Sequence, residues 1–407
     1  MLVFVQYTVQ MEALLEISRN LVQGVDNSFK RLLYSTIDWN NRLIGIKGQR
    51  GCGKTTMLLQ RLNELGKSPQ EAAYFALDDI YFTTNSLVET ATEFHKKGGQ
   101  YLFLDEVHKY PGWAQHIKSL HDYYADLKIV FTGSSIIDIA REEGDLSRRA
   151  RMYELQGLSY REYLKYSGVI ELQPLSLEEI LQKDKPWQRN FPPSFCPLQY
   201  FESYLKQGYY PFFKEDPDGL QERLKQLLWK IVESDMAELQ DFDVRNAKKM
   251  MQLLYILAAN VPFKPNISKL AEKTQIHRNT INNYLYFLEQ ARLIRLLYPT
   301  GISVAALQKP EKIYLDNTNL AHAIAVTPPE KGNLRETFFI NQLSALHAVR
   351  YPGKGDFMVD EKYVFEIGGK NKNDIQIRGT LNSYRVLDDA EFPASDAIPF
   401  WVFGFLY

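Results

Sequence analysis

The sequence predicts an α/β fold for its first 165 residues, in which helices flank a parallel sheet. Apolar runs typical of buried strands alternate with amphipathic runs typical of helices from residue 42 to about 165. Three of these apolar runs end in clusters of polar residues. Because ligands of parallel sheets bind at the carboxyl ends of the strands, we expect the three clusters to meet at one edge.

The first cluster is a glycine-rich loop, and residues 48–55 fit the pattern G-x-x-x-x-G-K-[ST] without a mismatch. Backbone N–H groups of such a loop converge on phosphate oxygens, and the helix that follows directs its positive end at the same anion. Lys54 is expected to reach the outer phosphates, and the Thr55 hydroxyl to bind Mg²⁺. The loop therefore predicts a site for ATP or GTP. Its expected residues are Gly48, Gly51, Cys52, Gly53, Lys54, Thr55 and Thr56.

The second cluster is Asp105 and Glu106, which end the apolar run 101–104. A carboxylate at a strand end beside a phosphate loop can hold Mg²⁺ through water, and Asp105 is the candidate. Glu106 points differently and is the candidate general base for an attacking water. The alternative is an ordinary acidic turn at the end of a strand.

The third cluster follows the run 126–131. Ser134 or Ser135 is a candidate catalytic residue that senses the γ-phosphate or orients water, and both are favoured over Thr132; a plain Gly-Ser turn is the alternative. Arg148 and Arg149 come next, and a guanidinium there can neutralise charge on the phosphoryl group as an arginine finger. Arg149 is the better candidate of the two. Clustered arginines also occur as a solvated or ion-paired surface.

The bulk composition sets limits on the class of protein. A chain of 407 residues is long enough for two or three domains, and a formal charge of −1 provides no general attraction to nucleic acid or anionic membranes. Two cysteines, Cys52 and Cys196, form no disulfide framework, which suits a reducing cytoplasm. The apolar opening, residues 1–5, is too short to span a membrane and is expected to be a strand or a packed terminus.

The glycine loop, the Asp105–Glu106 strand end and the segments that follow them resemble the corresponding motifs of the prokaryotic AAA-type ATPases. More narrowly, they resemble the subgroup whose C-terminal half is a domain of unknown function. The resemblance implies an Mg²⁺-dependent core that hydrolyses ATP, but it supplies no biological role. The resemblance rests on residues 48–56, 103–113, 131–135 and 146–149, and in the C-terminal half on 204–211, 312–317 and 365–372.

Residues 266–290 are predicted to form a helix, a short turn and a second helix, with 293–297 as the wing of a winged helix. The candidate DNA contacts lie in and before the second helix. From 261 to 295 the chain has six Lys and Arg side chains and two Glu, a local balance of +4. The alternative is a lid or an interaction module. The candidate residues are Lys273, Arg278, Asn279 and Asn282.

The last hundred residues are predicted to form a small α+β domain like that of restriction endonucleases. Glu336 lies on a helix, and Asp356 and Glu366 lie by two strands, where carboxylates can hold Mg²⁺ for phosphodiester cleavage. The lysine of such a site does not fit the spacing, because Gly368 occupies its place and Lys370 comes two residues later. The alternative is that these acids are ordinary charges at strand ends.

Together these patterns predict four segments: an ATPase domain over 1–165, a helical connector over 166–250, a winged helix over 251–300 and a nuclease-like domain over 301–407. We expect Mg²⁺-dependent ATP hydrolysis to drive a conformational switch in the C-terminal half, with DNA or a protein as partner. A nucleotide-gated DNA-binding regulator with slow hydrolysis is the first alternative, and an Mg²⁺-dependent nuclease, active or degenerate, is the second. An arginine finger acting between subunits would require a homo-oligomer.

Overall fold

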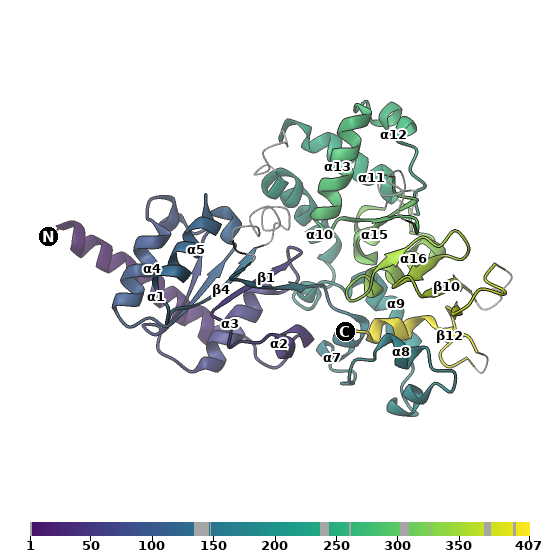
Figure 1. The fold of residues 1–407 in the computed structure, drawn as a ribbon, viewed down its shortest axis with the longest axis horizontal. Coiled ribbons are helices and arrows are strands. Elements are labelled where there is room, and N and C mark those ends of the chain that lie inside the picture. The colour runs from purple at the N-terminus through teal and green to yellow at the C-terminus, as the bar shows by residue number, and fades with distance from the viewer. Residues whose placement is uncertain are drawn as a thin grey trace. The chain divides into compact units, whose positions relative to one another are not determined.

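The computed structural model divides the chain into two compact units, Met1–Gln156 and Gly157–Tyr407 (Figure 1). Each unit is considered by itself. The residues that the structure describes are 2–133, 146, 148–236, 244–259, 262–301, 309–325, 327–369, 376–393 and 396–407.

The first unit contains the predicted parallel sheet, which confirms the α/β fold class. Its five strands lie in the order β2-β3-β4-β1-β5, and every neighbouring pair is parallel. The strands are β1 (Leu43–Gly48), β2 (Ala72–Ala76), β3 (Tyr101–Asp105), β4 (Lys128–Gly133) and β5 (Arg151–Leu155). The helices are α1 (Leu2–Gly24), α2 (Leu32–Thr36), α3 (Lys54–Leu65), α4 (Leu87–Lys96) and α5 (Trp113–Tyr123), with 3-10 turns η1 (Ile80–Thr83) and η2 (Val107–Lys109).

Both faces of this sheet are buried under helices, as a doubly covered parallel sheet requires. On β3, Leu102 and Leu104 belong to the core that contains α4 and α5. Phe103 between them points to the other face, into the core that contains α2 and α3. Figure 1 shows the strands between α3 on one side and α4 and α5 on the other. This continuous burial explains why the strands appear as unbroken apolar runs.

Helix α1 covers the edge of the sheet beside β2. The hydroxyl of Ser18 accepts a hydrogen bond from the backbone N–H of Tyr74 at 2.9 Å, which occupies a donor on the edge strand. Met11, Leu14 and Leu15 pack into the adjacent core at helical spacing. Residues 2–5 lie in α1, so the expectation of a strand there is wrong.

The second unit begins at Gly157, so the helix predicted at the end of the ATPase domain belongs to it. Ser159 caps α7 (Tyr160–Tyr166) through a capping box with Glu162, as its sequence predicts. The hydroxyl of Ser159 and the Nε of Arg161 both donate to the backbone carbonyl of Tyr407, the latter at 3.0 Å. These contacts join α7 to the C-terminal residues, which a boundary at 165 would separate.

The remaining elements of the second unit include helices, short turns and two small sheets. The helices are α8 (Leu177–Ile180), α9 (Pro197–Gln207), α10 (Leu220–Lys230), α11 (Ala247–Ala258), α12 (Ile267–Thr274), α13 (Arg278–Gln290), α15 (Thr318–Ile324) and α16 (Lys331–Leu343). The short turns are η3 (Pro186–Asn190), η4 (Pro211–Lys214), η5 (Ile231–Asp235), η7 (Val244–Asn246) and η8 (Phe400–Phe405). The strands are β6 (Ile294–Leu297), β7 (Lys312–Leu315), β8 (Val349–Arg350), β9 (Phe357–Val359), β10 (Tyr363–Gly368), β11 (Ser383–Leu387) and β12 (Ile398–Pro399).

The two sheets of the second unit differ in size and direction. Strands β6 and β7 form an antiparallel pair. The larger sheet has the order β12-β11-β10-β9-β8, in which β8, β9 and β10 are antiparallel neighbours and β10, β11 and β12 are parallel. Helix α16 packs against β10 of this sheet. Within the described part of the chain, no helix is both long enough and apolar enough to cross a membrane.

Candidate nucleotide-binding site

The glycine-rich loop connects β1 to α3 at the carboxyl edge of the first unit's sheet. Gly51 and Gly53 have backbone φ angles of 83° and 99°, a region that residues with a Cβ rarely adopt. Gly48 is needed for a different reason, because a Cβ there would lie 2.3 Å from the carbonyl oxygen of Leu155. The loop therefore depends on Gly48 and Gly53, which the motif specifies, and also on Gly51, which the motif leaves free.

The lysine and the cysteine of the loop are both buried. Lys54 Nζ donates to the carbonyl oxygens of Gly48 at 2.9 Å and Gln49 at 3.2 Å. Burial raises the pKa of the Cys52 thiol, with the charges of Lys54 and Arg31 opposing the shift. The thiol is fully enclosed in the core beneath the loop, so only the backbone of Cys52 is available for its predicted contact with a nucleotide. Thr56 is exposed on the first turn of α3.

Asp105 lies at the end of β3 and is 2% exposed. Its Oδ2 accepts hydrogen bonds from the Thr55 hydroxyl at 2.6 Å and the Tyr74 hydroxyl at 2.9 Å. Its Oδ1 accepts a hydrogen bond from the Thr132 hydroxyl. The structure therefore brings together Thr55 and Asp105, the two predicted magnesium ligands, although they belong to different elements.

Glu106 follows Asp105 in a left-handed backbone conformation, with φ 51° and ψ 42°. This conformation is uncommon for a residue with a side chain. Glu106 Oε2 lies 3.5 Å from His108 Nε2, and its backbone N–H donates to the Thr132 hydroxyl at 3.3 Å. The two adjacent acids thus have different surroundings, as their predicted roles require.

The sequence did not single out three residues around these acids, Tyr74, Asp78 and His108, and it ranked a fourth, Thr132, below Ser134 and Ser135. Burial, followed by the charge of Asp105, raises the pKa of Tyr74 far above its usual value. Burial, followed by the charge of Glu106, raises the pKa of Asp78, which places a third carboxylate near the pair. Polar residues inside an apolar strand were the available signal for Tyr74 and Thr132. Their hydroxyls fix the orientation of Asp105.

Of the third predicted cluster, Ser134 and Ser135 lie outside the described residues, as does Lys370 of the second unit. Arg149 donates from Nε and Nη2 to the carboxylate of Asp122 at 2.8 and 2.9 Å, and this pairing, followed by His121, lowers the pKa of Asp122 to about 2.

Arg149 precedes β5, whose first residue Arg151 pairs with Ile44 near the start of β1. The glycine loop follows Gly48 at the other end of β1. Arg149 is therefore held at the amino edge of the sheet, away from its own chain's loop, so an arginine-finger role requires a second subunit.

The predicted acids of the second unit share one neighbourhood with a lysine. Glu336 on α16 accepts hydrogen bonds from Lys312 Nζ at 2.9 Å and from the Tyr314 hydroxyl at 2.6 Å. Asp356 precedes β9 and accepts a hydrogen bond from the backbone N–H of Ile367 at 2.9 Å. Glu366 is fully buried in β10.

Burial raises the pKa of Asp356; the charges of Glu336 and Glu366 add to the shift, and that of Lys312 opposes it. In the described ranges, no three His, Cys, Asp or Glu side chains are arranged to hold a metal ion.

The predicted helix-turn-helix consists of α12 and α13. Ile281, Leu285 and Leu288 are buried, and the opposite face of α13 is exposed. Arg278 and Asn282 lie four residues apart on that exposed face. Lys273 and Asn279 are also exposed. The arrangement leaves the candidate DNA contacts accessible to solvent.

Comparison with known proteins agrees with the fold of the first unit. Residues 40–164 match the family described as AAA domain. This part of the chain is therefore similar to an AAA domain. Residues 198–331 match a domain of unknown function, DUF8612. The match to the AAA domain, together with the sheet topology, identifies the fold of the first unit as that of a P-loop NTPase.

Individual proteins add little to this assignment. An uncharacterized protein of Methanocaldococcus jannaschii is 29% identical over 287 residues, which cover 67% of this chain and 60% of that relative's length. The Walker-type ATPase of Pyrococcus abyssi is 13% identical, with a TM-score of 0.44, covering 73% of this chain and 95% of that one. DnaA from Aquifex aeolicus bound to AMPPCP is 15% identical, with a TM-score of 0.25, covering 63% and 84%. TM-scores this low do not relate the arrangement of this chain to either structure.

Proposed function

We propose that the chain binds ATP together with Mg²⁺ and hydrolyses it at the carboxyl edge of the AAA domain's sheet. The observation that carries this proposal is the contact of 2.6 Å between the Thr55 hydroxyl and Asp105 Oδ2, directly beside the glycine loop. A hydroxyl and a carboxylate on separate elements are gathered where the β- and γ-phosphates of a bound nucleotide would lie.

The chemistry of these donors fits a magnesium ion. Mg²⁺ prefers oxygen ligands and keeps several waters, so one hydroxyl and one carboxylate beside a phosphate site are sufficient protein contacts. When bound, the ion would neutralise charge that develops on the phosphate oxygens. Tyr74 and Thr132 support the site because their hydroxyls hold both oxygens of Asp105 in place.

The other residues have separate roles in the proposed reaction. Lys54 exchanges its contacts with the loop carbonyls for contacts with phosphate oxygens, since its ammonium already lies within the loop. Glu106 accepts the proton of the attacking water. His108 Nε2 lies 3.5 Å from the Glu106 carboxylate, and the backbone N–H of Glu106 donates to the Thr132 hydroxyl. The left-handed turn at Glu106 separates the proton acceptor from the metal-binding carboxylate.

Two substitutions test this function. Lys54→Ala removes a charged contact to the phosphates and is expected to weaken ATP binding by roughly 100-fold. Glu106→Gln retains the shape of the side chain but removes its basicity, so ATP binding persists while turnover falls about 100- to 1,000-fold. Binding is measured with a fluorescent ATP analogue, and turnover is measured as phosphate release.

Matched controls are Lys97→Ala and Glu89→Gln, which change exposed side chains of the same types on or beside α4. Both are expected to bind and hydrolyse ATP like the wild type. Undiminished hydrolysis in both Lys54→Ala and Glu106→Gln would rule out this site.

We further propose that nucleotide binding switches the conformation of the second unit, with DNA as the candidate partner through α13. The exposed Arg278 and Asn282 on one helical face, with Lys273 nearby in sequence, support this assignment. In the first alternative function, a nucleotide-gated DNA-binding regulator with slow hydrolysis, the DNA would bind the same exposed face of α13. The two free cysteines, Cys52 and Cys196, are compatible with action in the cytoplasm.

DNA binding predicts a salt-dependent affinity for duplex DNA that decreases in the variant Lys273→Gln/Arg278→Gln. The exposed Lys225→Gln on α10 serves as a control for loss of charge alone. Absence of binding to any duplex at low salt contradicts this part of the proposal, but leaves ATP hydrolysis unaffected.

A phosphodiesterase site in the second unit is the second alternative. Lys312 supports it, because this lysine approaches Glu336 from β7 and provides a cation where Gly368 offers none. Mg²⁺-dependent cleavage of DNA that disappears in Asp356→Ala would support this alternative. Cleavage that is absent at all Mg²⁺ concentrations leaves the cluster with a structural role.

A further inference from the structure

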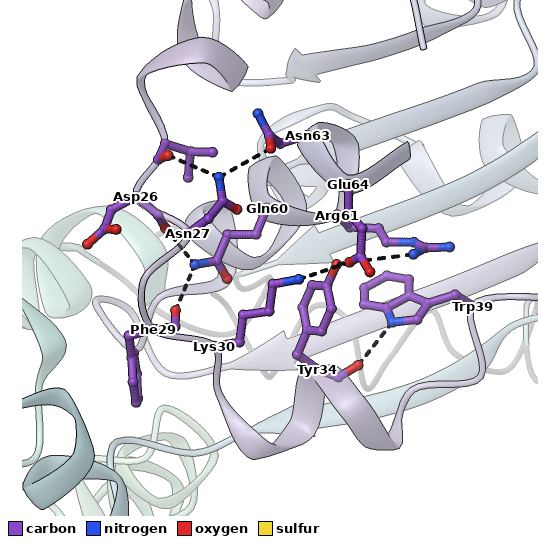
Figure 2. Close-up of polar contacts among 11 residues, drawn as sticks. Asp26, Asn27, Phe29, Lys30, Tyr34, Trp39, Gln60, Arg61, Asn63 and Glu64 are labelled. Atoms are coloured by element: carbon purple, nitrogen blue, oxygen red, sulfur yellow. Dashed lines mark hydrogen bonds and ion pairs between the residues drawn. The ribbon is translucent and has the colours of Figure 1, made fainter. Parts of the chain in front are cut away.

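Residues 26–39 form a connector that is fastened to helix α3, the helix that starts at the glycine loop (Figure 2). Gln60 on α3 donates from its side-chain amide to the carbonyls of Asp26 and Phe29, both at 2.8 Å. Glu64, one turn further along α3, accepts hydrogen bonds from Lys30 at 3.0 Å and from Tyr34. The connector therefore has a fixed position relative to the loop.

The connector's far end has one contact with the same helix, and further contacts lie within the connector. Trp39 Nε1 donates to the carbonyl of Tyr34 at 3.0 Å, and the Arg61 guanidinium lies over the Trp39 ring at 5.1 Å. Lys30 lies 4.3 Å from the centre of the Tyr34 ring. Arg31 lies between these anchors, in a segment that they hold in place. Its side chain is directed into the first unit and is only 7% exposed.

The Arg31 guanidinium joins two parts of the chain that are distant in sequence. Nη1 donates to the carbonyl of Cys52 in the glycine loop at 2.8 Å. Nη2 donates to the carbonyl of Gln156, the last residue of the first unit, also at 2.8 Å. A planar guanidinium presents its N–H groups in a fixed fork, so the two carbonyls cannot move independently while both bonds persist.

The contact with Cys52 also bears on the shape of the loop. A phosphate-binding loop needs its N–H groups directed at the ligand, and its carbonyls must then point away and find donors of their own. Lys54 satisfies the carbonyls of Gly48 and Gln49, and Arg31 satisfies that of Cys52. When a nucleotide draws Lys54 toward its phosphates, Arg31 remains as a cation on the outer side of the loop.

The contact with Gln156 lies next to the junction of the two units. On the other side of that junction, the backbone N–H of Leu158 donates to the carbonyl of Tyr209 at 2.7 Å. A Cβ at Gly157 would lie 2.3 Å from the Tyr209 ring, so the second unit holds its first residues closely. Each side of the junction is thus anchored within its own unit, and the anchor on the first side is Arg31.

We propose that Arg31 is a positioning residue that holds the glycine loop in its phosphate-binding shape and couples occupancy of the loop to the junction at Gln156. This inference rests on the proposed ATP binding. A bound nucleotide that shifts the Cys52 carbonyl also shifts the Arg31 guanidinium. The hydrogen bond from this guanidinium to the Gln156 carbonyl then changes as well. Because coupling is reciprocal, the factor by which nucleotide binding stabilises the junction equals the factor by which a stabilised junction strengthens nucleotide binding.

Hydrogen–deuterium exchange of the full chain tests this coupling. Exchange of the peptide covering residues 153–160 is compared with and without a saturating non-hydrolysable ATP analogue and Mg²⁺. In the wild type the analogue is expected to slow exchange in this peptide by about threefold or more, because local opening becomes less favourable. In Arg31→Met, analogue affinity falls by about tenfold, and exchange at saturation is the same as without the analogue.

Two further variants make the outcome decisive. Lys30→Met removes the neighbouring cation and its pair with Glu64, but leaves both carbonyl contacts of Arg31, so it is expected to match the wild type. Arg31→Lys keeps the charge but loses the planar fork, in which two separate nitrogens bond to the two carbonyls, so its protection is expected to fall between the wild type and Arg31→Met. Arg31→Lys alone decides the test if Arg31→Met does not fold.

The results that overturn the coupling are distinct from failure of the proposed function. A wild type that does not bind the analogue contradicts ATP binding itself. A wild type that binds it without slowing exchange at 153–160, or an Arg31 variant that retains wild-type affinity and protection, contradicts the role of Arg31.

Discussion

The two acidic clusters of this protein differ in what surrounds their carboxylates. In the AAA domain, the described partners of Asp105 are hydroxyl groups from Thr55, Tyr74 and Thr132. In the second unit, Glu336 is bound to the ammonium of Lys312. Neutral hydroxyls orient a carboxylate without cancelling its charge, whereas a lysine compensates the charge directly. This difference supports the proposal that the first cluster binds a cation from solution, whereas the second contains its own.

The largest expected effect comes from removing the charge of each cluster in turn. Asp105→Asn retains the side-chain shape but loses the charge, so ATP hydrolysis should fall by about 100-fold or more. Asp356→Asn, the equivalent change in the second unit, should leave ATP hydrolysis unchanged. Phosphate release by both variants under identical conditions measures the contrast, and equal losses would show that the clusters are not independent.

The lysine of the second cluster provides the next contrast. Lys312 and Glu336 have side chains only 11% and 21% exposed, so Lys312→Met leaves a largely buried carboxylate without its cation. We expect a loss of about 2–3 kcal/mol in the free energy of unfolding.

The control for this loss is Lys331→Met, which removes a pair with Asp389 whose side chains are 62% and 43% exposed. It should cost less than about 1 kcal/mol. Chemical denaturation of both variants gives the comparison, and equal losses would contradict the charge balance inferred for Glu336.

The pH dependence of stability should distinguish the second cluster further. Burial raises the pKa of Asp356 in the folded state, so the folded chain binds this proton more tightly than the unfolded chain. Its contribution to stability is therefore present below the unfolded pKa and is lost as pH rises through the folded pKa. Asp356→Asn should raise the Tm relative to the wild type at neutral pH, and the difference should vanish in acid. A difference in Tm that does not vary with pH would contradict the assignment.

The smallest expected effect concerns Arg149 at the amino edge of the AAA domain. Because Asp122 holds it away from its own loop, Arg149→Met should not change hydrolysis at low protein concentration. If subunits associate, hydrolysis per chain should rise with protein concentration in the wild type and fail to rise in Arg149→Met. Arg148→Met, an exposed neighbour, is the control. If hydrolysis per chain does not depend on protein concentration, Arg149 does not act as an arginine finger between subunits.

The sequence predicted the AAA domain well, because its signals are local. The glycine loop, the apolar strands and Asp105 with Glu106 are each contained in a few consecutive residues, and their parallel arrangement follows from alternation with helices. The supporting residues were missed because their contacts are distant in sequence. Arg31 lies 21 residues from Cys52 and 125 from Gln156, and Tyr74 lies 31 from Asp105.

In the second unit, too, contacts between residues distant in sequence could not be predicted. Glu336, Asp356 and Glu366 were predicted as neighbours from their positions in a helix and two strands, but the lysine came from β7, earlier in the chain. Spacing around Glu366 placed the lysine at Gly368, with Lys370 two residues late. It did not indicate Lys312, because spacing carries no information about a strand in a different sheet. The DNA contacts and the domain boundaries within this unit stay predictions.

The dependence of ATP hydrolysis on Mg²⁺ tests the central claim most directly. Phosphate release by the wild type is measured in excess EDTA and then over a range of added Mg²⁺. The proposed site predicts no turnover in EDTA, a saturable rise with Mg²⁺, and a rise that is largely lost in Asp105→Asn. Hydrolysis that continues in excess EDTA, or that is absent at every Mg²⁺ concentration, would contradict the account.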